Sequence, residues 1–87
     1  NTKMQNMDRS RIIEKLNSIF REVFKNENLV VTENLCADDI EDWDSLLDTV
    51  LLDKVESDFE IKFKFKEIIN MENVGDMIDR IVEHLSK

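Results

Sequence analysis

The chain has 87 residues, with 20 acidic and 12 basic side chains and a formal net charge of −8. A chain this short forms one small domain with a thin core, which leaves little room for a deep catalytic cleft. Its acidic surface disfavours nucleic acid and anionic lipid headgroups as partners, and it favours proteins with basic docking patches.

The numbers of glycine, proline and cysteine residues limit which folds and which cellular compartments are expected. One glycine and no proline argue against hairpins and tight turns, and for helices joined by irregular loops. The single cysteine, Cys36, permits no internal disulfide, which fits a reducing cytoplasm. No apolar stretch is long enough for a membrane span or a signal peptide. We therefore expect a cytoplasmic monomer that contacts neither membrane nor nucleic acid.

The first expected helix begins at about Asp8 or Ser10 and ends near Lys25. Residues 1–7 show no pattern and are interpreted as a disordered tail or an expression remnant, so the single domain is taken as residues 8–87. Apolar residues in the helix recur at helical spacing and fall on one stripe, with charged residues opposite. The stripe consists of Ile12, Ile13, Leu16, Ile19, Phe20, Val23 and Phe24.

Residues 26–44 are expected to form a long irregular connection. Isolated apolar residues along it predict that it is pinned over the core, and a loop of this length in a compact domain tends to be functional. These anchors are Leu29, Val31, Leu35, Ile40 and Trp43.

A second helix is predicted from Ser45 to about Asp58 or Phe59. Asp44 and Ser45 supply its cap, and Asp48 stands three residues after Ser45, as in a capping box. Residues 59–66 then alternate apolar side chains with lysine, which is the period of a strand. A lone strand would have no partner, so we expect an extended segment that leads into a short helix near residues 65–70.

The last expected helix spans residues 74–85, with Asn73 as its N-cap and Asp76 in its first turn. His84 is expected at the surface near its C-terminal end. Three longer amphipathic helices and one short helix predict an all-α four-helix bundle.

The stretch Asp42-Trp43-Asp44-Ser45-Leu46 closes the long loop and opens the second helix. A serine there has its hydroxyl near solvent at a helix N-terminus, where the helix dipole and free backbone N–H groups favour an attached phosphate. A serine before an amphipathic helix is more often only a cap, so this residue alone does not decide between the two roles.

The helix that follows carries apolar side chains on two faces. Placed by angle, Leu51, Leu52, Val55 and Phe59 share the core face. Leu46 and Val50 point away from that face and Leu47 lies at its border. Apolar side chains grouped on an acidic surface are typical of a docking site. The alternative is that the loop bearing Trp43 folds over them.

Residues 8–86 resemble an acyl or peptidyl carrier protein. The attachment motif of that family, Asp-Ser-Leu, stands here as Asp44-Ser45-Leu46, and Trp43 before it is similar to a branch of discrete carriers with the motif Trp-Asp-Ser-Leu. Val55–Phe59 resembles the acidic end of the family's second helix, and residues 73–85 resemble its last helix. The resemblance implies an acyl-carrier-protein-like bundle in which Ser45 carries a 4′-phosphopantetheine arm derived from coenzyme A, with acyl groups held as thioesters.

The resemblance also implies partners. A carrier is not an enzyme and has no catalytic residue or metal of its own; a phosphopantetheinyl transferase modifies it. Acyl-transferring, condensing or ligase enzymes with basic docking patches then use the resulting phosphoprotein in fatty-acid biosynthesis, other lipid metabolism, or related polyketide or secondary biosynthesis. Leu47 and Val50 stand where the family is usually acidic, and lysines 62, 64 and 66 add a basic strip. These departures favour a specialised pathway.

Two sets of residues follow from the resemblance. The expected docking residues are Trp43, Leu46, Leu47, Asp48, Val50, Asp53 and Glu56. The expected lining for a short acyl chain folded back between the second and third helices is Leu51, Val55, Phe59, Ile61, Phe63 and Ile68. The alternative for the second set is an ordinary close-packed core.

The sequence also allows three interpretations other than a carrier protein: a calcium site, a cysteine site and a helical adaptor. An EF-hand counted from Asp42 would have leucines at its fifth and sixth positions, which excludes that calcium site, although diffuse binding of divalent cations is predicted. Cys36 has no nearby histidine or second cysteine, so neither a nucleophile nor a metal site is expected. The remaining alternative is a non-catalytic helical adaptor that binds partner proteins, in which Ser45 is a cap or a kinase site of the form Ser-x-x-Asp.

Overall fold

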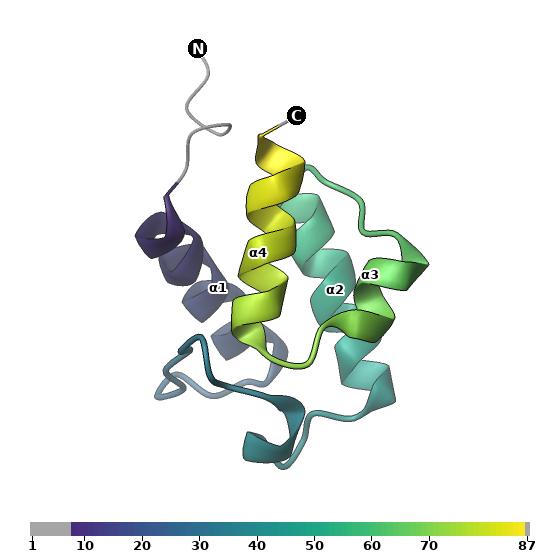
Figure 1. Cartoon of the computed structure of the whole chain (residues 1–87). Coiled ribbons are helices and arrows are strands. Elements are labelled where there is room, and N and C mark those ends of the chain that lie inside the picture. Colours follow the sequence, from purple (N-terminus) through teal and green to yellow (C-terminus); the bar gives the residue numbers. More distant parts are fainter. Residues whose placement is uncertain (1–7, 87) are drawn as a thin grey trace.

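The computed structural model describes residues 8–86. This part of the chain forms four α-helices joined by loops (Figure 1). Helix α1 spans Arg9–Val23, α2 spans Ser45–Phe59, the short α3 spans Phe65–Asn70 and α4 spans Val74–Leu85. One 3₁₀ turn, η2, spans Ala37–Asp39. The predicted all-α bundle of three longer helices and one short helix is confirmed. The tail predicted for residues 1–7, and Lys87, lie outside the described residues.

Local capping explains where the helices begin and end. Asp8 caps α1 by accepting a hydrogen bond from the Arg11 N–H at 3.0 Å. The helix ends at Val23, slightly before the predicted Lys25, because Lys25 takes a left-handed backbone with φ 53°. Asn73 caps α4 through the Asp76 N–H at 2.9 Å, as the sequence predicted.

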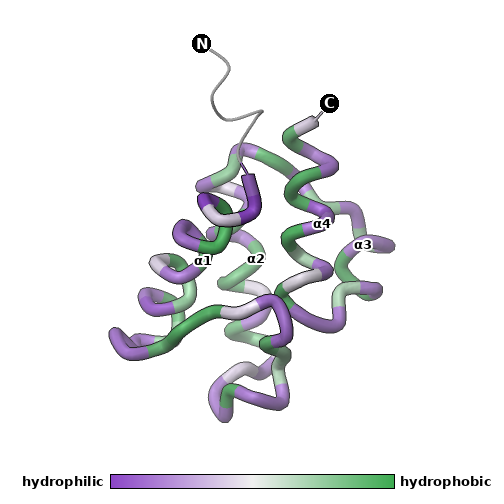
Figure 2. The backbone as a smooth tube through the Cα atoms, turned by 60° about the vertical axis from the view of Figure 1, so that its left-hand side comes forward, coloured by the Kyte–Doolittle hydropathy of each residue, from purple (hydrophilic) through white to green (hydrophobic). Residues whose placement is uncertain are grey.

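The core lies between the three longer helices. Each contributes a buried apolar stripe, and Figure 2 shows hydrophobic and hydrophilic residues alternating along α1 and α4. Helix α3 has no buried residue and lies against the outside of the bundle with Ile68 half-buried. The fully buried large side chains are Phe20, Phe59, Ile12, Leu16, Ile19, Leu51, Ile78, Ile81, Val55 and Val74.

The long connection between α1 and α2 crosses one end of the bundle (Figure 1). Val31 is buried and its N–H donates to Asn17 Oδ1 of α1 at 2.8 Å. At the other helix, the carbonyl of Leu35 accepts from Val74 N at 2.9 Å and the carbonyl of Glu33 accepts from Gly75 N at 2.8 Å. The loop is therefore pinned to α1 and α4, as predicted.

Close approach of this loop to α4 accounts for the chain's one glycine. A Cβ on Gly75 would stand 3.1 Å from the carbonyl oxygen of Glu33. The η2 turn inside the loop was not predicted from the sequence. That turn forms because the Asp39 carboxylate accepts the Cys36 N–H at 3.1 Å.

Helix α3 is attached to α4 through a histidine. His84 Nε2 lies 2.9 Å from Glu67 Oε1, and the two side chains are 13% and 18% exposed. The His84 ring also packs edge-on against Phe63, with centroids 5.9 Å apart. The prediction of a surface histidine was therefore wrong, because Glu67 of α3 and Phe63 of the segment before it pack against His84.

No helix among residues 8–86 is both long enough and apolar enough to cross a membrane.

Candidate functional site

Ser45 stands at the first position of α2, and its neighbour Asp44 is the N-cap. Asp44 Oδ1 accepts the Leu47 N–H at 2.9 Å, and the Asp44 carbonyl accepts the Asp48 N–H at 2.8 Å. Ser45 is exposed, and within residues 8–86 its hydroxyl takes part in no hydrogen bond. Since Asp44 performs the capping, the Ser45 hydroxyl has no structural task at this helix end.

The start of α2 is electrostatically suited to a phosphate. The backbone N–H groups of Ser45 and Leu46 have no acceptor within the helix, and the positive end of the helix dipole lies at this terminus. Together they favour an anionic group attached to the Ser45 oxygen. The carboxylates of Asp44 and Asp48 reduce that preference without cancelling the free N–H donors.

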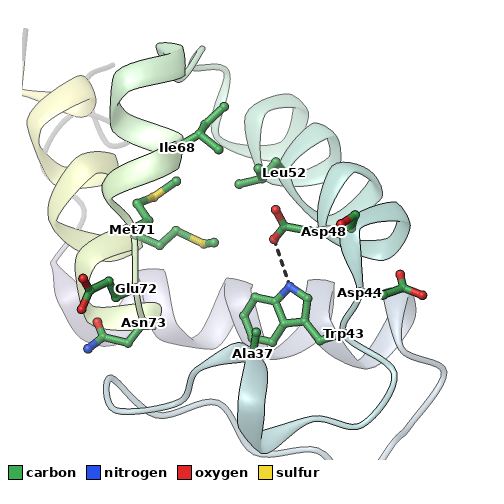
Figure 3. Close-up of a pocket in the computed structure, with 11 residues that line it drawn as sticks. Ala37, Trp43, Asp44, Asp48, Leu52, Ile68, Met71, Glu72 and Asn73 are labelled. Atoms are coloured by element: carbon green, nitrogen blue, oxygen red, sulfur yellow. Dashed lines mark hydrogen bonds between the residues drawn. The ribbon is translucent and has the colours of Figure 1, made fainter.

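The capping box predicted between Ser45 and Asp48 was wrong. Because Asp44 is the N-cap, the third helical position is Leu47, and Asp48 lies one residue too late to reach back to the cap. Asp48 Oδ1 instead accepts the indole N–H of Trp43 at 2.9 Å (Figure 3). This bond joins the end of the long loop to the first turn of α2.

Trp43 itself is half-buried against α1. Its ring meets Phe20 edge-on, with centroids 5.4 Å apart and planes at 84°, and it lies 5.6 Å from Phe24. Packing on the two phenylalanines and the bond to Asp48 fix the loop on both sides of Asp44. The backbone that presents Ser45 is thus held by the core.

A cavity of about 450 Å³ opens beside Ser45, between α2, α3, the η2 turn and the segment that joins α3 to α4. Its wall combines apolar side chains, including the ring of Trp43, with polar and charged ones. Figure 3 shows Leu52 and Ile68 on facing helices, with Met71 on the connection after α3. The remaining lining residues are Ala37, Asp44, Asp48, Glu72, Asn73 and Met77.

Only Ile68, of the six residues expected to line an acyl site, reaches this cavity. The others pack into the core or against it, which corresponds to the close-packed alternative: Leu51, Val55, Phe59, Ile61 and Phe63. Leu52 was predicted on the core face with Leu51, and this is confirmed, since Leu52 is buried in the core. The 100° step from Leu51 also turns Leu52 toward α3, so that it lines the cavity as well. Met71 and Met77 also line the cavity, but nothing in the sequence distinguishes them from ordinary core residues.

The residues expected at a docking face divide into three groups. Leu46 and Val50 are 72% and 45% exposed, Asp53 is exposed, and the loop bearing Trp43 does not cover them. Leu47 is half-buried against the core. The other three are engaged within the chain: Trp43 and Asp48 bond to each other, and Glu56 Oε2 accepts the Phe63 N–H at 2.8 Å.

Helix α3 presents exposed apolar side chains that were not among the predicted docking or lining residues. Phe65 is 76% exposed and Ile69 is 60% exposed, and their four-residue spacing places them on one face. The three lysines at 62, 64 and 66 are exposed around them. The sequence around them alternates apolar residues with lysine, and this pattern is more typical of a strand than of an exposed helix face.

The structure supports neither a reactive site at Cys36 nor a metal site within residues 8–86. Cys36 is half-buried, with its sulfur 3.5 Å from Asp39 Oδ2 in the η2 turn. Within residues 8–86, no group of three or more histidine, cysteine, aspartate or glutamate side chains is arranged to hold a metal ion.

Comparison with known proteins gives one informative result. No protein-family model matches the sequence, and no curated protein matches it either. Among solved structures, the chain is similar to a holo acyl carrier protein from Geobacter metallireducens, determined by solution NMR. The two share 36% sequence identity with a TM-score of 0.81, and the match covers 85% of each chain.

Proposed function

This chain belongs to the acyl carrier protein family, and we propose that it carries acyl intermediates as thioesters on a 4′-phosphopantetheine arm attached to Ser45. The similar structure is that of a holo protein. The observation that carries the proposal is the division of roles at the start of α2. Asp44 caps the helix, which leaves the exposed Ser45 hydroxyl free beside a cavity that has apolar walls at Leu52, Ile68 and Met71.

The residues around Ser45 fit the proposed group. The free N–H groups of Ser45 and Leu46 at the helix N-terminus favour the phosphate of the arm. The cavity beside Ser45, walled by Leu52, Ile68 and Met71, suits a short acyl chain. When attached, the arm supplies a terminal thiol that holds the acyl group.

Among residues 8–86, no histidine or lysine lies at Ser45 to take up its proton: His84 is paired with Glu67 between α3 and α4 and does not line the cavity at Ser45. In this proposal a separate phosphopantetheinyl transferase, with its own metal ion, activates the Ser45 oxygen. That oxygen attacks the β-phosphate of coenzyme A, and 3′,5′-ADP leaves. The protein acts as a non-catalytic carrier in this proposal.

Exposed residues on α2 supply a docking face for the transferase and for acyl-transferring, condensing or ligase enzymes. Leu46 and Val50 are its apolar part, and Asp53 beside them attracts partners with basic patches. Each docking event is expected to be weak and salt-sensitive, because the cargo must move on. We place the protein as a monomer in the cytoplasm, in fatty-acid or related polyketide or secondary biosynthesis.

The test is an intact-mass measurement. The purified protein is incubated with coenzyme A, magnesium and a broad-specificity phosphopantetheinyl transferase. We expect a gain of one phosphopantetheine in the parent and in Ser57→Ala, which removes another exposed hydroxyl of α2, and none in Ser45→Ala. No gain in the folded parent, while a known carrier is modified in parallel, would favour an adaptor with a carrier's fold. A gain that persists in Ser45→Ala would refute the site.

A further inference from the structure

Asp48 is the charged side chain that points into the cavity beside Ser45. Figure 3 shows its carboxylate between Leu52 and Trp43, facing Met71 across the open space. The other two carboxylates of the lining, on Asp44 and Glu72, are directed away from that space. Asp48 is half-buried, whereas Asp44 and Glu72 are exposed.

The hydrogen-bonding capacity of Asp48 is only partly used. A carboxylate offers about four lone-pair sites on its two oxygens. Oδ1 accepts the Trp43 indole N–H at 2.9 Å, and no other donor within residues 8–86 bonds to this carboxylate. No lysine, arginine or histidine lines the cavity, so the negative charge of Asp48 has no counterion there.

We propose that Asp48 makes the cavity discriminate acyl groups by charge: it binds acyl chains that bear an amino group and rejects those that end in a carboxylate. An ammonium group would donate a hydrogen bond to the free acceptor sites of Asp48 and neutralise its charge. A carboxylate would be brought against a like charge in a space that apolar side chains partly shield from water. This inference rests on the proposed carrier function.

The rest of the cavity accommodates the chain that links such a group to the arm. A volume of about 450 Å³ is sufficient for several carbon atoms together with part of the arm. Met71 and Met77 supply flexible apolar walls that adjust to chains of different shape. Asp48 is thus the residue that sets the charge of the cargo, and the methionines leave its length less restricted.

Asp48 also has a structural role that the test must separate from cargo selection. Its charge lies in the first turn of α2, where it stabilises the helix through the dipole, and its bond to Trp43 fixes the loop. Asp48→Asn keeps an oxygen for the indole N–H and removes the charge. The matched control is Asp58→Asn, which removes an exposed carboxylate of the same helix outside the cavity and the docking face.

The experiment compares three arms of similar length. Pentanoyl, 4-aminobutanoyl and succinyl groups are joined by an amide to a pantetheine analogue in which an amine replaces the terminal thiol. The amide resists the hydrolysis and cyclisation that thioesters undergo. Each is loaded enzymatically from its coenzyme A analogue and confirmed by mass. The melting temperature and the Trp43 fluorescence are then compared with those of the unacylated holo form of the same variant, so that any general destabilisation cancels.

We expect the 4-aminobutanoyl form to melt highest and the succinyl form no higher than the holo form, with a gap of about 4 °C between the two. Asp48→Asn should close most of that gap, and Asp58→Asn should preserve it. Equal melting temperatures for the two charged cargoes in the parent, or a gap that survives in Asp48→Asn, would overturn the inference. If neither coenzyme A nor any of the analogues adds an arm to Ser45 by mass, the proposed function itself is refuted and the inference falls with it.

Discussion

The roles of Asp44 and Ser45 can be separated by measuring stability. Asp44→Ala removes the hydrogen bond from the Leu47 N–H, which is 2.9 Å long. Loss of an N-cap side chain costs about 1 kcal/mol, and loss of its negative charge at a helix N-terminus adds about 0.3–1 kcal/mol. Ser45→Ala breaks no hydrogen bond and places a better helix former at the first helical position, so its effect should stay within about 0.5 kcal/mol.

Urea unfolding followed by the helical circular dichroism signal measures both changes. A loss of about 1 kcal/mol in a domain of this size also lowers the melting temperature by roughly 4–8 °C. Asp44→Asn is the control, because its amide oxygen still caps the helix, and it should retain most of the parent's stability. If Ser45→Ala costs as much as Asp44→Ala, then the serine hydroxyl does cap the helix, and the reasoning that frees it for modification is refuted.

Three further outcomes are expected. The Lys64 N–H and then His84 lower the pKa of Glu67, so its contribution to stability is present above the unfolded value of 4.5 and is lost as pH falls through the folded pKa. In urea titrations the acid loss should be smaller for Glu67→Gln than for the parent, and identical profiles would contradict this. Glu60 ends α2 with φ 58°, so Glu60→Gly should raise stability by about 0.5–1 kcal/mol and Glu60→Ala should not; equal effects would refute the strain argument. Millimolar magnesium should raise the melting temperature more than sodium chloride of equal ionic strength, because the net charge is −8; no difference would exclude divalent binding.

Most of the fold was predictable because its signals are local. Asn73 caps α4 through the residue three positions on, and the predicted bounds of that helix agree with the structure at both ends. The start of α2 and the short α3 also lie where the sequence placed them. Apolar periodicity and capping residues act within a few residues of one another, so they can be read from a single chain.

The contacts that the sequence did not reveal are tertiary. The Asp48–Trp43 bond depends on how the loop packs on α1, and the His84–Glu67 pair depends on α3 folding back over α4. The residues that line the cavity were equally hard to predict from the sequence. Angular placement identifies the core face of α2, but it cannot say that Leu52, unlike the adjacent Leu51, also lines a cavity beneath α3.

The local arrangement at Ser45 decides more about function than the bundle does, because a helical bundle of this kind is compatible with both a carrier and an adaptor. Helix α2 keeps its Asp44 cap whether or not a hydroxyl follows it, so loss of loading in Ser45→Ala reports on chemistry and not on folding. Asp48 differs, because the carboxylate that faces the cavity also holds Trp43 against α2. Its effect on stability therefore says nothing about cargo, and only the difference between cargoes within one variant separates its two roles.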